Sequence, residues 1–199
     1  MALAMLASLA SAPAIARQTT PVVSIDSAID GPAGMLRLDM MLGGSFYDDG
    51  YSTRSQFRAG AYFGVNLIPR AWSPLYIGLP LAFGFGNGFA TVRIIPEVEW
   101  DLRISKAIPL YFFPAVGIGA LSAYRSPCND EPSACMGESF VDAMRFAVHA
   151  GGGFKYIHAG RLNVSVQPLS VDAVQSGSSK GWVNFWNLMV VGVGANFGR

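Results

Sequence analysis

The chain has 199 residues and a net charge of +1; 14% of its residues are charged and 51% are hydrophobic. This length allows one domain with a large core, and the sparse charge leaves no basic stripe of the kind that binds nucleic acid. No run of about 18 apolar residues follows the N-terminal region, which argues against a helical membrane protein. A membrane β-barrel or a soluble β protein is left.

The N-terminal residues have the pattern of an export signal. An apolar stretch over residues 2–10 precedes Ala14-Ile15-Ala16, which matches the A-x-A pattern of signal-peptide cleavage sites. No Lys or Arg precedes the apolar stretch, so an ordinary N-terminal helix is the alternative. We predict a signal peptide over residues 1–16, a periplasmic segment over 17–34 and one folded domain over 35–199.

Eight segments of that domain alternate between polar and apolar residues, and a period of two predicts β-strands. The segments are residues 35–46, 56–68, 75–85, 91–104, 110–123, 141–157, 162–175 and 182–197. In the fourth, "TVRIIPEVEWDLRI", every charged residue is odd-numbered and the even-numbered residues are mostly apolar. In the eighth, the alternation places Phe185 on the apolar face and Asn184 and Trp186 on the polar face.

The polar faces of these segments mix charges with glycines and with large aromatic residues such as Tyr62 and Tyr76. That mixture suits the interior of a small barrel, where large and small side chains interleave, while the uncharged apolar faces suit lipid. We therefore expect the charges to point inward and to pair, because unpaired enclosed charge is unfavourable. The predicted interior network comprises Arg37, Asp39, Arg58, Arg93, Glu97, Glu99, Asp101, Arg103, Arg145, His149 and Lys155.

Each segment reaches the roughly 9–11 residues of a tilted membrane strand, and short turns alternate with mostly longer polar connections. In these features the chain resembles the small eight-stranded outer-membrane β-barrels of Gram-negative bacteria, of the OmpA-transmembrane or OmpX type. The closing "NLMVVGVGANFGR" is similar to their C-terminal strand signal, although Gly198 and Arg199 follow its aromatic Phe197. The resemblance implies an all-β, eight-stranded, antiparallel up-and-down transmembrane barrel, with outer-membrane lipid and the barrel-assembly machinery as partners.

Four prolines lie inside the predicted strands, at positions 80, 96, 114 and 168. Each removes a backbone hydrogen bond from the sheet or requires a bulge. The alternative fold is a soluble barrel of lipocalin type with the apolar rows inside. Its outer face would then carry glycine, tyrosine and few charges, which is unfavourable for solubility.

Two polar connections carry the candidate contact surface. The stretch "RSPCNDEPSACMGES" holds Cys128 and Cys135, which in an exported chain predict a disulfide rather than free thiols. A zinc site would need two further ligands, and no histidine lies in this stretch. Two roles are open for the connections 47–55 and 124–140: recognition of an extracellular protein or a glycan, or a protease-resistant cap. The candidate contacts are Tyr47, Asp48, Asp49, Tyr51, Tyr124, Asp130 and Glu131.

The predicted function is that of a structural or interaction barrel with a plugged lumen, because eight strands enclose a space about filled by side chains. A narrow channel for small solutes is the first alternative, and a lipid-modifying barrel enzyme or a soluble lipocalin-like binder is the second. The sequence shows no nucleophile motif, phosphate loop or metal-ligand spacing. We therefore expect no catalytic residue, metal or cofactor.

Overall fold

A computed structural model describes residues 34–48, 53–68, 74–86, 89–105, 107–125, 144–175 and 181–198, and these form strands, turns and short connections. The strands are β1 (Leu36–Asp48), β2 (Thr53–Asn66), β3 (Leu75–Gly86), β4 (Phe89–Ile94), β5 (Glu97–Trp100), β6 (Leu102–Arg103), β7 (Leu110–Arg125), β8 (Met144–His158), β9 (Leu162–Gln175) and β10 (Trp182–Phe197). No helix long and apolar enough to cross a membrane occurs in these described ranges.

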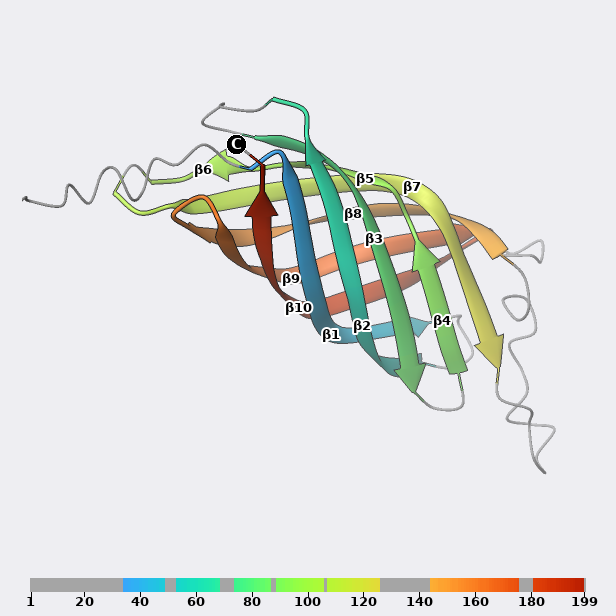
Figure 1. Ribbon diagram of the computed structural model, residues 1–199. Coiled ribbons are helices and arrows are strands. Elements are labelled where there is room, and N and C mark those ends of the chain that lie inside the picture. The colour runs from blue at the N-terminus through green and yellow to red at the C-terminus, as the bar shows by residue number, and fades with distance from the viewer. Residues whose placement is uncertain are drawn as a thin grey trace, which may run out of the picture.

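The sheet closes on itself into a barrel (Figure 1). Strands β4, β5 and β6 follow one another between β3 and β7, so the three segments form one interrupted strand, called here the β4/β5/β6 strand. Strand β1 pairs with β2 on one side and with β10 on the other, which joins the ends of the sheet. All pairings are antiparallel, and the predicted closed eight-stranded barrel is confirmed.

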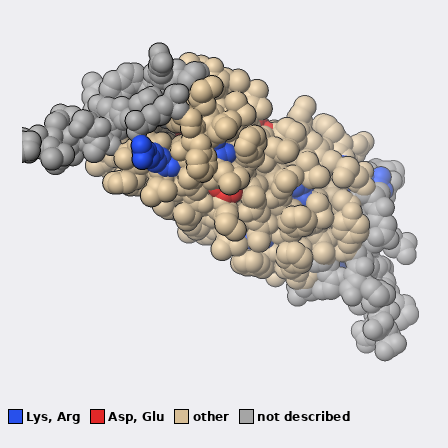
Figure 2. Space-filling model, viewed as in Figure 1, with Lys and Arg blue, Asp and Glu red and all other residues tan. Residues whose placement is uncertain are grey.

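Alternation along the strands places polar side chains inside and apolar side chains outside. In β3, buried and exposed residues alternate strictly from Tyr76 to Gly84, both of which are buried. Outward-facing Met40, Ile118 and Val193 are 74%, 63% and 59% exposed. Figure 2 shows an outer surface on which charged side chains are sparse. An apolar surface of this extent is unfavourable in water and indicates contact with another apolar phase.

Aromatic side chains on the outer surface lie near both ends of the strands. Those near the chain termini and tight turns are Phe63, Trp100, Phe112, Phe154, Tyr156 and Phe197, and those toward the opposite end are Phe57, Phe83, Phe85, Tyr124, Phe146 and Trp182. Within these sets, Phe112 of β7 and Phe154 of the neighbouring β8 have ring centroids 5.8 Å apart, and Phe146 of β8 and Trp182 of β10 have ring centroids 6.0 Å apart across β9. Two aromatic belts separated by an aliphatic band are typical of barrels that cross a membrane.

The four prolines have different effects on the wall. Pro80 and Pro114 stay within the sheet, in register with Tyr62 and Gly152. Pro96 lies in the interruption between β4 and β5, where no sheet pairing is formed. Pro168 lies at a bulge, because the register of β9 on β8 shifts beside it.

The Pro168 bulge has a counterpart in β10. Strand β9 carries one extra residue opposite the stretch between Gly152 and Phe154 of β8. Strand β10 likewise carries one extra residue opposite Gly43 of β1. Met189 in β10 adopts a left-handed backbone with φ of 47°, and Pro168 and Met189 are the residues skipped by the otherwise regular β9–β10 register. The paired bulge therefore reverses which side chains face inward in β9 after Pro168 and in β10 before Met189. These parts of the two strands lie toward the barrel end opposite the chain termini, called here the upper end.

This reversal corrects one sequence-based prediction. Phe185 was expected on the outer face, yet it is buried inside the barrel with 2% exposure. Trp186, expected inside, is on the opposite side of the strand from Phe185. The prediction was wrong because it carried the alternation of residues 191–197 through Met189 without a bulge.

Candidate functional site

The end of the barrel near the chain termini encloses five charged residues, called here the terminal-end cluster: Arg37, Asp39, Glu99, Asp101 and Lys155. Arg37 donates from Nε to Asp39 Oδ2 at 2.5 Å and from Nη1 to Glu99. Lys155 donates from Nζ to Glu99 and to Asp101 Oδ1, the latter at 2.6 Å. All five are at most 3% exposed, so the two cations and three carboxylates screen one another in place of water.

Aromatic rings complete the packing of the terminal-end cluster. The guanidinium carbon of Arg37 lies 4.4 Å from the ring centroid of Tyr62, and Lys155 Nζ lies 4.8 Å from that of Phe113. Tyr76 lies within 5.6 Å of both cations and is fully buried. These cation–π contacts fill the cross-section of the barrel at this level with side chains.

Two glycines make room for the Tyr62 ring. A Cβ atom on Gly78 would lie 2.2 Å from Tyr62 Cζ, and one on Gly64 would lie 2.6 Å from Tyr62 Cε1. Real Cβ atoms essentially never approach neighbours this closely, so a Cβ at either position would require the Tyr62 ring to shift. The glycines on the polar faces of β2 and β3 thus have a packing reason.

A second group of charges lies nearer the middle of the barrel and is called here the Asp172 cluster. Its members are Arg58, Arg93, Glu97, His149, Asp172 and Asn187. Arg93 Nε donates to both carboxylate oxygens of Asp172 at 3.1 Å, and His149 Nδ1 lies 2.6 Å from Asp172 Oδ1. Asn187 Nδ2 donates to Asp172 Oδ2 at 3.1 Å.

Arg58 and Glu97 complete the Asp172 cluster. Arg58 Nη1 donates to Asn187 Oδ1 and lies 3.5 Å from Asp172 Oδ2. Glu97 Oε2 lies 3.7 Å from Arg93 Nη2 and 3.8 Å from His149 Nε2. Asp172 is therefore the carboxylate around which two guanidinium groups, an imidazole and an amide are arranged, and it is 1% exposed.

Asp172 and Asn187 were absent from the predicted network. They face inward only because of the paired bulge at Pro168 and Met189, which shifts the upper parts of β9 and β10 by one residue. Without the bulge, Asp172 would face outward, onto the apolar surface. A lone carboxylate on the otherwise apolar face of a strand that also contains a proline is the sequence signal that could have revealed the shift.

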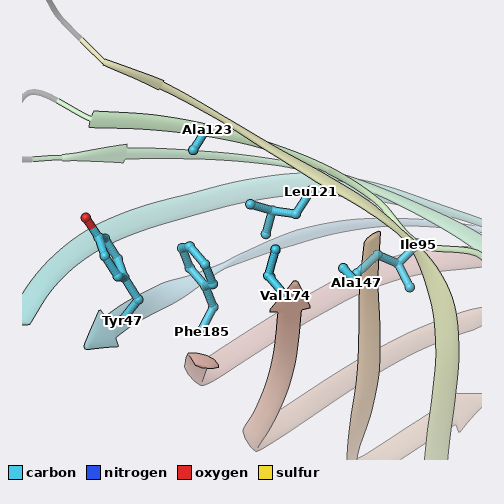
Figure 3. Close-up of a cluster of buried hydrophobic side chains, with 7 residues drawn as sticks. All are labelled: Tyr47, Ile95, Leu121, Ala123, Ala147, Val174 and Phe185. Carbon is cyan, nitrogen blue, oxygen red and sulfur yellow. The ribbon is translucent and has the colours of Figure 1, made fainter. Parts of the chain in front are cut away.

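An apolar layer lies at the level of the upper strand ends (Figure 3). Its buried side chains are Tyr47, Ile95, Leu121, Ala123, Ala147, Val174 and Phe185. Tyr47 and Phe185 stack with ring centroids 4.8 Å apart. Ile95 lies between Arg93 and Glu97 along its strand, so this apolar layer borders the Asp172 cluster directly.

Tyr47 corrects another prediction. The sequence placed it among the loop contacts, but β1 extends through Asp48 and Tyr47 is only 5% exposed. Tyr124 lies near the end of β7 and is 48% exposed. Asp49, Tyr51, Asp130 and Glu131 lie outside the described residues, as do the predicted disulfide partners Cys128 and Cys135, the predicted signal segment and all of the predicted periplasmic segment except residue 34.

Two arginines of the predicted network lie apart from both clusters. Arg103 is half-buried at the terminal end, where its Nε donates to the carbonyl oxygen of Ser105 at 2.9 Å. Arg145 is half-buried in β8, and its Nε has no hydrogen-bond partner within the described part of the chain. The other nine predicted residues all belong to one of the two clusters.

His149 is 3% exposed; its Nδ1 lies 2.6 Å from Asp172 Oδ1 and its Nε2 lies 3.8 Å from Glu97 Oε2. Within the described ranges, no three His, Cys, Asp or Glu residues form a group that could hold a metal ion.

Comparisons with known proteins agree with this architecture at the level of fold. Neither protein-family models nor curated proteins give a match. Among solved structures, neisserial surface protein A is similar with a TM-score of 0.59 and 11% identity, covering 84% of this chain and 99% of that chain.

Two further solved structures are weaker likenesses. The N-terminal β-barrel domain of Pseudomonas aeruginosa OprF has a TM-score of 0.48 and 14% identity, covering 83% of this chain and 99% of that chain. The outer membrane enzyme PagL has a TM-score of 0.48 and 14% identity, covering 78% of this chain and 97% of that chain. The chain has the fold of a small eight-stranded outer-membrane barrel, and the likeness to neisserial surface protein A carries that conclusion.

Proposed function

We propose that this protein is a non-enzymatic outer-membrane barrel of a Gram-negative bacterium, with a plugged lumen and a structural or interaction role at the cell surface. The observation that carries the proposal is the filling of the interior by three adjoining groups of side chains. The terminal-end cluster, the Asp172 cluster and the apolar layer are each made of side chains that are almost wholly buried. A barrel filled in this way acts as a rigid anchor rather than as a pore.

The outer surface supports residence in a membrane. Its aliphatic band lies between two aromatic belts, the arrangement expected for strands that cross lipid. The similarity in fold to neisserial surface protein A agrees with this placement. Outer-membrane lipid would then be the immediate partner of the barrel, and the barrel-assembly machinery would be its partner during insertion.

The candidate interaction surface is at the barrel end opposite the chain termini. The upper ends of β1, β3, β7 and β9 lead into the connections 49–52, 87–88, 126–143 and 176–180. Within them, a disulfide between Cys128 and Cys135 would restrain the longest connection. Asp49, Tyr51, Asp130 and Glu131 are the proposed contacts to an extracellular protein or a glycan.

Membrane placement is tested on envelopes from cells that express the full chain. The expected result is a Sarkosyl-insoluble protein in the outer-membrane fraction whose unheated and boiled forms migrate differently in SDS gels. A protein recovered in the soluble fraction, with no heat-dependent shift, would contradict the proposal and would favour the lipocalin-like alternative.

Loop presentation is tested with an epitope tag inserted after residue 131, compared with the same tag inserted after Gly160. Gly160 lies in the tight turn between β8 and β9, at the terminal end of the barrel. Antibody should stain intact cells for the first insertion only, and should stain both after the envelope is permeabilised. Staining of intact cells through the Gly160 tag alone would reverse the proposed orientation.

A further inference from the structure

Glu99 and Asp101 are neighbouring carboxyl groups inside the terminal-end cluster. Both face inward from the β4/β5/β6 strand, and they are 3% and 0% exposed. Lys155 Nζ donates to both of them, and the two side chains also lie within hydrogen-bonding reach of each other. An ionised carboxylate can only accept hydrogen bonds, so a bond between two carboxyl groups requires a proton on one of them.

The charges of the terminal-end cluster do not balance without such a proton. The cluster holds three carboxyl groups and two cations, all of them at most 3% exposed. An excess negative charge is unfavourable where water does not reach it. Two carboxyl groups that share one buried site therefore tend to hold a proton between them, because like charges at this separation repel each other.

The hydrogen bonds indicate which carboxyl group carries the proton. Glu99 accepts from two cations, Arg37 and Lys155. Asp39 accepts on both of its oxygens. Asp101 accepts from Lys155 through Oδ1 alone, and its buried Oδ2 receives no hydrogen bond from the described part of the chain. The negative charge of Asp101 would therefore be the least compensated of the three.

The other titratable groups around the pair do not change this assignment. Arg103 follows Asp101 on the same strand, but it is half-buried near the barrel end and its Nε donates to the Ser105 carbonyl oxygen. The remaining neighbours are tyrosines and carboxylates, which bring no positive charge: Tyr62, Tyr76, Tyr111, Asp39 and Glu97.

We propose that Glu99 and Asp101 form a buried proton-binding site, in which neutral Asp101 donates its proton to ionised Glu99. The inference depends on the fold and not on the proposed function. A carboxyl group that is neutral in the folded barrel and ionised in the unfolded chain binds one proton on folding, so the free energy of unfolding falls as the pH rises. Loss of the proton at alkaline pH leaves two adjacent carboxylates on Lys155, and the terminal-end cluster is thus a pH-sensitive element of the barrel.

Two acid-to-amide substitutions on the same strand test the assignment. Asp101→Asn imitates the neutral acid, since its amide keeps an acceptor for Lys155 and a donor for Glu99. Glu99→Gln removes the anion on which Arg37 and Lys155 converge. In urea titrations of the full chain in detergent micelles at neutral pH, Asp101→Asn should unfold like the parent. Glu99→Gln should raise the equilibrium constant of unfolding by about 100-fold or more.

The pH dependence and an infrared spectrum report the proton itself. Toward alkaline pH the parent should lose stability relative to Asp101→Asn, by at most about tenfold in the equilibrium constant of unfolding for each pH unit, because one proton is released. Groups common to both proteins cancel in this comparison. In a detergent without ester groups, the parent should show the C=O stretching band of a protonated carboxyl group. That band should shift in D2O and be absent from Asp101→Asn.

Three results would overturn the inference. Asp101→Asn that fails to fold, or is destabilised as strongly as Glu99→Gln at neutral pH, would show that Asp101 is an ionised partner of Lys155. Parallel pH dependence of the parent and Asp101→Asn would show that the pair binds no proton on folding. The infrared spectrum of the parent tests the proposal even without a variant, because absence of a protonated-carboxyl band contradicts it. A band that persists unchanged in Asp101→Asn would belong to another carboxyl group.

Discussion

The terminal-end cluster and the Asp172 cluster use the same residue types but depend on the sequence differently. Arg37, Glu99 and Lys155 lie on stretches whose alternation is unbroken, so the inward position of each follows from its odd number. Asp172 faces inward only because β9 and β10 each carry one extra residue at the same height. The comparison teaches that a buried charge network in a barrel can be specified by a paired register shift as well as by simple alternation.

The largest effect is expected from deleting Pro168 and Met189 together. The deletion removes the extra residue from both strands and would turn Asp172 and Asn187 toward lipid. Arg58 and Arg93 would lose their main counter-charge in the interior. We expect a loss of about 5 kcal/mol or more in the free energy of unfolding, enough to prevent recovery of the heat-modifiable folded form.

Met189→Gly is the matched control for this deletion. It keeps the residue count and suits the positive φ of 47° better than methionine does. The barrel should therefore fold with stability equal to or slightly above that of the parent in urea titrations. A double deletion that folds as well as Met189→Gly would show that the bulge does not position the Asp172 cluster.

The next largest effect should distinguish the two clusters by single substitutions. Asp172→Ala removes the carboxylate shared by Arg58, Arg93 and His149, and should lower the free energy of unfolding by about 3–5 kcal/mol.

Asp39→Ala is the matching substitution in the terminal-end cluster. It should have the smaller effect because Arg37 keeps its ion pair with Glu99. Urea unfolding in detergent micelles, followed by the gel shift, measures both. Equal losses, or a larger loss for Asp39→Ala, would contradict the view that one carboxylate organises the Asp172 cluster.

A smaller effect is expected from filling the space beneath Tyr62. Gly78→Ala puts a methyl group against the ring and should destabilise the barrel by about 1–3 kcal/mol. Gly44→Ala is the control, because its Cβ would meet only ordinary contacts at 3.9 Å. Combining Gly78→Ala with Tyr62→Ala should cost less than the sum of the single changes. Additive losses would show that the ring and the glycine are not packed as described.

The smallest effect should come from an arginine outside both clusters. Arg145→Gln changes a half-buried side chain of β8 whose Nε has no hydrogen-bond partner within the described part of the chain, and should change the free energy of unfolding by about 1 kcal/mol or less. Arg37→Gln, by comparison, leaves Asp39 and Glu99 without their guanidinium partner. If Arg145→Gln destabilised the barrel as strongly as Arg37→Gln, the separation of Arg145 from the two clusters would be wrong.

Much of this arrangement could be predicted from the sequence because it depends on local alternation. The number of strands and the inward direction of the charges follow from a period of two and from the apolar outer faces. The roles of Phe185 and Asp172 could not be obtained in that way, because the backbone at Met189 shifts both strands together. Tyr47 was misplaced for a simpler reason, since β1 extends further than the hydrophobic pattern indicated.

The central claim is that the interior is closed along the barrel axis, and ion conductance across planar bilayers tests it most directly. The folded full-length protein should insert without producing discrete current steps. Tyr62→Ala combined with Tyr76→Ala removes two rings that close the terminal end, and serves to show that an opened interior would be detected. Stable, reproducible current steps from the unmodified protein would contradict the plugged barrel and would favour the narrow small-solute channel.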